Sequence, residues 1–494
     1  MNLGQTLTFG QTVWALSPEL VLLVTAILVL ILDVVRPHQE GKRWPPYVTL
    51  AGLAVAGAAV VSLWLAGCNT RVLAVVSCDP FSLAVKFIAL LAMAIVVLSS
   101  DVFIRTRKLS QGVFYALLLF STLAICLLGA SVDLIMIFLA FDFLSIVSYV
   151  LTGYLRGSRR SAEAAIKYML YGAGLSAMML YAMSWLYGLT GQTNLEGIAS
   201  TLAMGEQMLR PMLFPILIML LAGFAFKIGA VPFHQWAPDA YEGAPTPVTA
   251  FLSVGPKIAG FALLVRITVI AFPSTLNFVH LDWRTLLMAI TAVTMTLGNL
   301  VALWQRNIKR MLAYSSIAQA GYILIGVVAA SPLGTAGVLI YLLAYAVTNL
   351  GAFAAIIAFS NQVGSDYISD YAGLSKRAPG LAALLLISLL SLGGIPPTAG
   401  FFGKVYLFSA ALQSGLIWLA VVGVINSVIS LGYYWKVIRE MYMVEPKSED
   451  VIVTPRSLGV ALGVTMTGVL LVGIFSNPLL HLLEPVVRVL FLRS

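Results

Sequence analysis

Six basic residues lie within long apolar segments and one acidic residue lies near the centre of such a segment, and the chemistry of this chain must be sought among these seven. They are Asp142, Lys86, Lys167, Lys227, Lys257, Arg266 and Lys404. An unpaired charge in the centre of a bilayer costs at least about 2.5–3.5 kcal/mol, so such residues pair, contact water or perform chemistry. Removal from water disfavours the charged form of an amine, which allows a buried lysine to bind and release a proton near neutral pH.

Lys227 and Lys257 lie too deep for their side chains to reach the membrane surface. Lys257 is about 18 Å from the start of its predicted helix at a rise of 1.5 Å per residue. Lys227 comes just before Gly229-Ala230-Val231-Pro232, where proline should break the helix. A break is tolerated at this depth only where protein or water meets the freed backbone groups. We therefore predict that both lysines transfer protons.

Lys404 follows a second break, Gly393-Gly394-Ile395-Pro396-Pro397. The two broken segments, 212–232 and 380–412, thus share a design in which a lysine lies within two turns of a proline break. They are five spans apart, and an odd offset reverses the direction of crossing. This pattern predicts an inverted repeat, which is where transporter sites commonly form.

Asp142 is the acidic residue near the centre of an apolar segment, and we expect it to act with Lys227. A carboxylate close to the lysine would hold its proton, and withdrawal of the carboxylate would release it. The two groups would then titrate as one coupled unit. A permanent ion pair that joins two helices is the structural alternative.

The remaining buried charges have simpler explanations. Lys86 is a turn and a half into its span, and we expect its long side chain to extend to the membrane surface. Arg266 lies about a turn from a helix end and is expected to be structural. Lys167 lies one turn into its span, and its position alone favours neither a structural nor a transport role.

The composition explains why these charges are exceptional. Hydrophobic residues make up 60% of the 494 and charged residues only 10%, against roughly 25% charged in soluble domains. The apolar runs are long and continuous, which predicts membrane helices rather than barrel strands. No strands are evident. The net charge of +9 is not gathered into a basic cluster with aromatics, so nucleic acid is not an expected partner.

The three cysteines offer no thiolate cage for an electron carrier. Cys68, Cys78 and Cys126 have neither metal-ligand nor iron–sulfur spacing. Cys68 and Cys78 share one short connection and could pair, although free thiols are the favoured interpretation.

The apolar runs predict an all-α polytopic membrane protein with about fourteen transmembrane helices. Spans four to eight and nine to thirteen form two inverted five-helix repeats, each with a broken helix. We expect a three-helix N-terminal extension (1–111), the two repeats (112–271 and 283–435) and a C-terminal loop with a final helix (436–494). The spans are 17–35, 47–67, 81–99, 112–129, 132–153, 163–190, 212–232, 245–271, 285–303, 310–330, 335–360, 380–412, 414–435 and 457–476.

The distribution of basic residues tests this topology. Eighteen lie in connections on one side of the membrane and five on the other, termini included. Cytoplasmic connections are enriched in lysine and arginine, so both termini are expected on the non-cytoplasmic side. Ser17–Val35 lacks the features of a cleaved signal peptide and is expected to be a retained first span.

Three motifs carry a resemblance to a known family. They read FDFLSIVSYVLTGY (141–154), FKIGAVPFHQWAPDAYEGAPTPVTAFLSVGPK (226–257) and KRMLAYSSIAQAGY (309–322). From about residue 80 to 440 the chain resembles the antiporter-like subunits of respiratory complex I, NADH-quinone oxidoreductase, and in particular the N subunit (subunit 2). The long second motif is highly specific.

The resemblance implies roles for particular residues. Asp142 and Lys227 match the family's carboxylate–lysine pair, Lys257 its connecting lysine and Lys404 its terminal lysine. Lys167 matches a further lysine. The family usually has glutamate where Asp142 stands, so the shorter side chain puts direct contact with Lys227 in doubt.

His234 also matches the family, either as a proton relay or as a hydrogen bond that ties the opened helix to its neighbour.

The resemblance also implies partners. Flavin, iron–sulfur clusters and quinone are expected in partner subunits and no cofactor in this chain. The other complex I membrane subunits, including another antiporter-like subunit, are the expected partners, in an energy-transducing membrane such as the bacterial inner membrane. The alternatives are a cation/proton antiporter, a membrane-hydrogenase subunit, and a structural anchor that conducts nothing.

Overall fold

A computed structural model describes residues 7–35, 43–204, 206–272, 283–448 and 450–491. Some predictions fall elsewhere: Arg36, Lys42 and Arg493, which entered the charge count, lie outside the described residues, as does the side chain of Arg210. The expected junction between the two repeats, residues 272–282, also lies almost entirely outside them.

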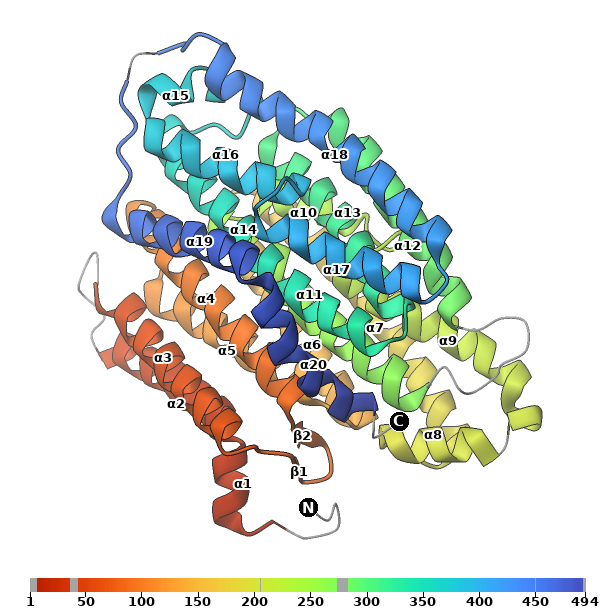
Figure 1. The fold of residues 1–494 in the computed structure, drawn as a ribbon. Coiled ribbons are helices and arrows are strands. Elements are labelled where there is room, and N and C mark those ends of the chain that lie inside the picture. Colours follow the sequence, from red (N-terminus) through yellow and green to blue (C-terminus); the bar gives the residue numbers. More distant parts are fainter. Residues whose placement is uncertain (1–6, 36–42, 205, 273–282, 449, 492–494) are drawn as a thin grey trace.

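The described chain forms a bundle of membrane helices (Figure 1). Twelve described helices are long and apolar enough to cross a membrane. The twelve are α2 (Ser17–Val35), α3 (Trp44–Leu65), α4 (Pro80–Thr106), α5 (Gln111–Ala130), α6 (Leu134–Thr152), α7 (Arg159–Thr190), α11 (Thr246–Arg266, extended by the π-helical η1, Ile267–Ala271), α12 (Trp283–Leu303), α13 (Ile308–Val328), α14 (Pro332–Val363), α18 (Ile417–Met443) and α19 (Arg456–Ile474).

Local signals in the sequence set the ends of these helices. The Asp79 carboxylate accepts a hydrogen bond from the backbone N–H of Ser82 and caps α4, and Ser331 caps α14 in the same way through Gly334. α7 and α14 end at Gly191 and Gly364, which have positive φ angles of 64° and 72°. Such side-chain caps and left-handed glycines satisfy the backbone groups that a helix end leaves without partners.

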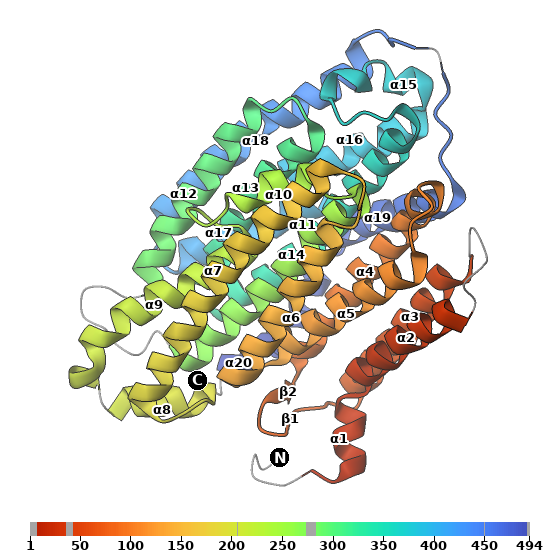
Figure 2. The same cartoon turned by 180° about the vertical axis from the view of Figure 1, so that it is seen from behind.

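The helices differ in how far they are buried. α11, α13 and α14 are buried almost throughout and form the centre of the bundle. α2 and α3 lie side by side at one edge (Figure 2) and expose apolar side chains such as Ile31 and Val55. An apolar outer surface around a buried centre suits a lipid solvent.

The two predicted helix breaks are confirmed. α9 (Glu206–Ile228) stops before the proline break and α10 (Trp236–Gly243) resumes after it; α16 (Pro379–Gly393) and α17 (Ala399–Gln413) flank the second break. Gly229 and Gly394 have φ angles of 73° and 85°, which disfavour any side chain. Twelve unbroken helices and two broken ones are compatible with the predicted fourteen spans.

The prediction that the chain has no strands is wrong. β1 (Thr70–Val72) and β2 (Val76–Cys78) form an antiparallel hairpin in which Thr70 pairs with Cys78. Strands of three residues are too short to show an alternating pattern, which explains the miss. Cys68, Cys78 and Cys126 are buried free thiols.

In the described part of the chain, five short helices lie outside the spans. They are α1 (Phe9–Ala15), α8 (Leu195–Met204), α15 (Leu374–Arg377), the 3₁₀ turn η2 (Ile368–Tyr371) and α20 (Ser476–Phe491). The sequence analysis predicted one helix after residue 436, whereas α20 follows α19 and packs on α14 and α4. Its buried positions, Leu480, Leu483, Val487 and Leu490, recur with helical spacing, so one face covers the bundle.

Candidate functional site

Lys227 is held by α6. It lies in the last turn of α9 and is 1% exposed. Its Nζ donates hydrogen bonds to the Phe141 carbonyl oxygen at 3.1 Å and to Ser145 Oγ at 2.5 Å. The ammonium also lies 3.9 Å from the centre of the Phe141 ring, a cation–π arrangement. One turn of α6 therefore supplies all of these contacts.

Asp142 is turned away from Lys227. Its Oδ1 accepts a hydrogen bond from Ser176 Oγ of α7 at 2.8 Å, and no ion pair joins Asp142 to Lys227 in the described part of the chain. Asp142 lies three residues before Ser145, on a neighbouring part of the helix surface, but its carboxylate is bound by Ser176 of α7. The alternative of a permanent ion pair is therefore wrong for this conformation.

Lys257 contacts the first helix break. Its Nζ donates to the carbonyl oxygens of Ile228 and of Ser316 in α13, both at 2.7 Å. Ile228 is the last residue of α9, and the carbonyls at a helix C-terminus lack partners and carry partial negative charge. A buried ammonium is thus bound by two neutral backbone oxygens.

Lys404 contacts the second break in the same manner. Its Nζ donates to the carbonyl oxygens of Leu392 and Gly393, at the end of α16, at 3.2 and 3.1 Å. A third bond, of 2.9 Å, goes to Ser427 Oγ of α18. The sequence paired the first break with Lys227, but the ammonium that binds its freed carbonyl belongs to Lys257.

α13 connects Lys257 with Lys404. One turn beyond Ser316, the Gln319 amide Nε2 donates to the Leu392 carbonyl oxygen at 3.0 Å, and this oxygen also accepts from Lys404. Tyr341 in turn donates to Gln319 Oε1. The sequence analysis quoted this segment for its resemblance but missed the link. The available signal was Ser-Ser-x-x-Gln within an otherwise apolar, buried helix.

Hydroxyl groups surround this link. Tyr345 donates to Ser316 Oγ at 2.8 Å, and the Tyr241 hydroxyl lies 3.2 Å from the same atom. Tyr434 forms hydrogen bonds with Ser315 and Gln319. Hydroxyls can donate and accept, so this cluster can pass protons as well as hold helices together.

Lys167 belongs to a charged cluster on the surface rather than to the buried row. Its side chain is 47% exposed and its Nζ lies 2.7 Å from Glu163 and 2.9 Å from Asp239. Arg310 contacts Asp239 at 2.8 Å and Glu242 at 3.0 Å. These side chains line an open cavity of about 220 Å³ above α10.

The position of Asp239 between two cations affects its ionisation. Partial burial raises the pKa of this carboxyl, but the hydrogen bonds and charges of Lys167 and Arg310 outweigh burial, so its pKa lies below the ordinary value.

His234 lies between α9 and α10 and is half-buried. Within the described residues its ring forms no hydrogen bond to a neighbouring helix, while its carbonyl oxygen accepts from the Ala237 N–H at 3.0 Å. The predicted tie between helices is therefore not formed, and the relay role stays a prediction.

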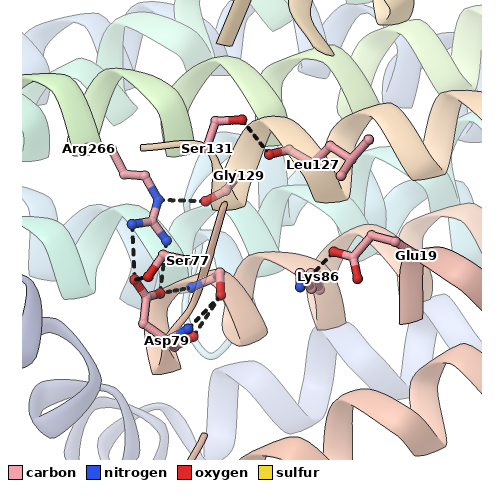
Figure 3. A network of polar contacts seen from close by, with 9 residues as sticks. Glu19, Ser77, Asp79, Lys86, Leu127, Gly129, Ser131 and Arg266 are labelled. Atoms are coloured by element: carbon pink, nitrogen blue, oxygen red, sulfur yellow. Dashed lines mark hydrogen bonds and ion pairs between the residues drawn. The ribbon is translucent and has the colours of Figure 1, made fainter. Parts of the chain in front are cut away.

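Lys86 and Arg266 form buried ion pairs next to the bundle centre (Figure 3). Lys86 is 1% exposed and its Nζ lies 2.6 Å from Glu19 of α2. The prediction that it reaches the membrane surface is wrong, because the Glu19 carboxylate binds its ammonium inside the bundle. Arg266 has the expected structural role: it donates to Asp79 at 3.0 and 2.8 Å and to the Gly129 carbonyl at 2.7 Å.

Comparisons with known proteins match this architecture. The family described as "NADH:quinone oxidoreductase/Mrp antiporter, TM" matches residues 131–430. NADH-quinone oxidoreductase subunit N 2 of Chloroherpeton thalassium is 42% identical over 96% of this chain and 94% of that protein. NAD(P)H-quinone oxidoreductase subunit 2 of Gloeothece citriformis is 45% identical over 95% and 92%. A chain of respiratory complex I from Thermus thermophilus with bound aureothin is 30% identical, with a TM-score of 0.79 over 94% of this chain and 98% of that one.

Replacing Arg266 should destabilise the protein strongly. Arg266→Met leaves the buried Asp79 carboxylate without its cation, a loss of about 3–5 kcal/mol. We expect a lower Tm for the detergent-purified protein, and a partial recovery in the double variant Arg266→Met/Asp79→Asn. Equal Tm values for the single variant and the wild type would show that the pair does not hold α4 to α11.

The surface cluster should contribute stability that depends on pH. The pKa of Asp239 is lower in the folded than in the unfolded protein. The stabilisation by its carboxylate is therefore fully present above the ordinary aspartate pKa of about 3.9, and it is lost as the pH falls through the pKa of the folded state. Asp239→Asn should lower Tm slightly at pH 7, because partly exposed ion pairs contribute less than about 1 kcal/mol to the free energy of unfolding. The difference from wild type should shrink below pH 4. Glu163→Gln, which leaves both contacts of Asp239 in place, is the control.

Proposed function

Because this chain belongs to the family of NADH-quinone oxidoreductase N subunits, we propose that it moves protons across the membrane along Lys227, Lys257 and Lys404. The observation that carries the proposal is the row of three ammonium groups, each at most 3% exposed. They are bound by neutral oxygens, and the polar residues of α13 link the second to the third.

Neutral ligands suit a lysine that must give up its proton. A carboxylate in contact would favour the charged state, whereas carbonyl and hydroxyl oxygens stabilise it less. Lys257 and Lys404 can therefore alternate between ammonium and amine. The hydroxyls of Tyr241, Tyr345 and Tyr434, with water, supply intermediate positions for the proton between them.

Asp142 acts in this proposal as the switch for Lys227. In the present conformation its carboxylate binds Ser176, which leaves the Lys227 ammonium to α6 alone. Rotation of the Asp142 side chain towards Lys227 would hold the proton there, and its return to Ser176 would favour release. The two groups then titrate as a pair.

The charged cluster at Lys167 is proposed as the surface end of the path. Its members Asp239 and Glu242 lie on α10, and Tyr241 between them turns inward to Ser316, whose carbonyl binds Lys257. α10 thus joins a solvated group of ionisable side chains to the buried row. His234, at the start of the same segment, is proposed as a relay.

The energy for transport is proposed to come from partner subunits. The chain is a multi-pass membrane protein of a respiratory complex, as the match to a complex I chain supports. We place flavin, iron–sulfur clusters and quinone in other subunits, and we expect contact with another antiporter-like membrane subunit. The bacterial inner membrane, with both termini on the non-cytoplasmic side, is the proposed location.

A cation/proton antiporter remains the second candidate function, because the matching family description includes Mrp antiporters. The relatives that cover almost the whole chain at 42–45% identity bear quinone oxidoreductase names, and this observation favours the first.

Lys257→Ala tests the proposal in the intact complex. We expect at least a tenfold loss of proton translocation, because no other ammonium binds the freed carbonyl of Ile228 in the described structure. Dye quenching in membrane vesicles would report proton translocation and a separate assay would report quinone reduction. Lys376→Ala, an exposed lysine, is the matched control. Undiminished pumping by an assembled Lys257→Ala complex would favour the structural anchor.

Gln319→Leu tests the link through α13. The change leaves the Leu392 carbonyl with one donor fewer and the Tyr341 hydroxyl without its acceptor. The variant removes the polar link between Lys257 and Lys404, so we expect pumping to slow by roughly fivefold or more, equivalent to about 1 kcal/mol in the barrier, while the complex still assembles. Gln319→Glu keeps an acceptor for Tyr341 but loses the donor to Leu392 and adds a carboxylate near Lys404, so it should slow pumping as well. The same rate in the leucine variant and the wild type would argue that protons bypass α13.

A further inference from the structure

An open groove lies between two connections that the topology places on one side of the membrane. It is formed by the α4–α5 and α6–α7 connections and has a volume of about 650 Å³. Arg107, Lys108 and Arg156 line it, and no carboxylate is among its lining residues in the described chain. The groove therefore gathers basic side chains from both connections, and Arg107 and Arg156 are exposed within it.

Backbone groups add to this charge. α5 and α7 both begin at the groove, with the N-cap residues Ser110 and Ser158 among its lining. Helix N-termini present unpaired N–H groups and partial positive charge, which favour phosphate and other anions. Tyr154 donates to the Ser110 carbonyl at 2.6 Å and fixes the two connections relative to each other. The cations and the two helix ends thus belong to one preformed surface.

Exposed apolar side chains continue from the groove along the membrane face. Val113 lines the groove itself and is 39% exposed. Val150 and Ile146, one turn apart on α6, are 51% and 54% exposed. α5, α6 and α7 lie side by side on this face (Figure 2). A basic pocket above an apolar helix face complements the two parts of a phospholipid, because the basic groups can bind the phosphate head group and the apolar face can contact the acyl chains.

We propose that this groove binds the phosphate head group of an anionic phospholipid, whose acyl chains lie along α6. Arg107 and Arg156 supply the principal charges; the Arg107 guanidinium rests on the Phe103 ring, 4.3 Å from its centre, which orients it. Free phosphate would satisfy the cations but not the apolar face. The lipid would cover part of the outer surface of α6, the helix that carries Asp142, away from Lys227.

The intact complex, delipidated in detergent, provides the test. Native mass spectrometry would follow the binding of short-chain phosphatidylglycerol, of phosphatidylcholine with the same chains, and of inorganic phosphate. We expect phosphatidylglycerol to bind the wild type most tightly. Each arginine near the surface accounts for roughly fivefold in affinity, so Arg107→Gln/Arg156→Gln should weaken binding by about 25-fold.

Two control variants keep the result interpretable. Arg306→Gln/Arg439→Gln removes two exposed charges from the same predicted side and should bind phosphatidylglycerol like the wild type. Arg107→Lys/Arg156→Lys keeps the charge and should retain most of the affinity even if glutamine disturbs the fold. Equal loss in both glutamine pairs, equal binding of the two lipids, or displacement of phosphatidylglycerol by millimolar phosphate would overturn the proposal.

Discussion

The interaction on which the rest of the structure depends is that of a buried ammonium with the carbonyls of a broken helix. A backbone oxygen without a partner is costly in a membrane, and so is a lysine without one. At Ile228 and at Leu392–Gly393 each satisfies the other, through Lys257 and Lys404. These hydrogen bonds between lysines and freed carbonyls compensate for the cost of the proline breaks, of the left-handed glycines and of the polar face of α13.

These hydrogen bonds link the protonation state of the two lysines to the backbone of the broken helices. An amine binds a helix C-terminus less strongly than an ammonium does, because the attraction to the partial negative charge is lost with the proton. Release of a proton from Lys257 therefore weakens the hold on the end of α9, and α9 carries Lys227 one residue earlier. Conversely, a movement of α9 alters the ligands of Lys257. Proton transfer at Lys257, as proposed, would therefore be coupled to the geometry of the break through this hydrogen bond.

Much of this architecture could be predicted from local sequence. Hydropathy gave most spans within a few residues, and Gly-Pro clusters located both breaks. What could not be predicted depends on long-range contacts: the ion pair of Lys86 with Glu19 forms only because α2 packs near Lys86. The rotation of α6 decides that Asp142 meets Ser176 and not Lys227. Neither fact has a signature in one segment alone, and the hairpin at 70–78 is too short to have one.

The groups that each charged side chain contacts determine which function it can have. Arg266 and Lys86 each face a buried carboxylate, which locks their charge and makes them fixed supports of α4. Lys167 shares carboxylates in a solvated cluster, where protons exchange with water. In the described structure, Lys227, Lys257 and Lys404 meet carbonyl, hydroxyl and aromatic groups and no carboxylate within ion-pair distance. A cation held only by neutral groups can become neutral without stranding an opposite charge, so these three lysines are the ones chemically free to carry protons.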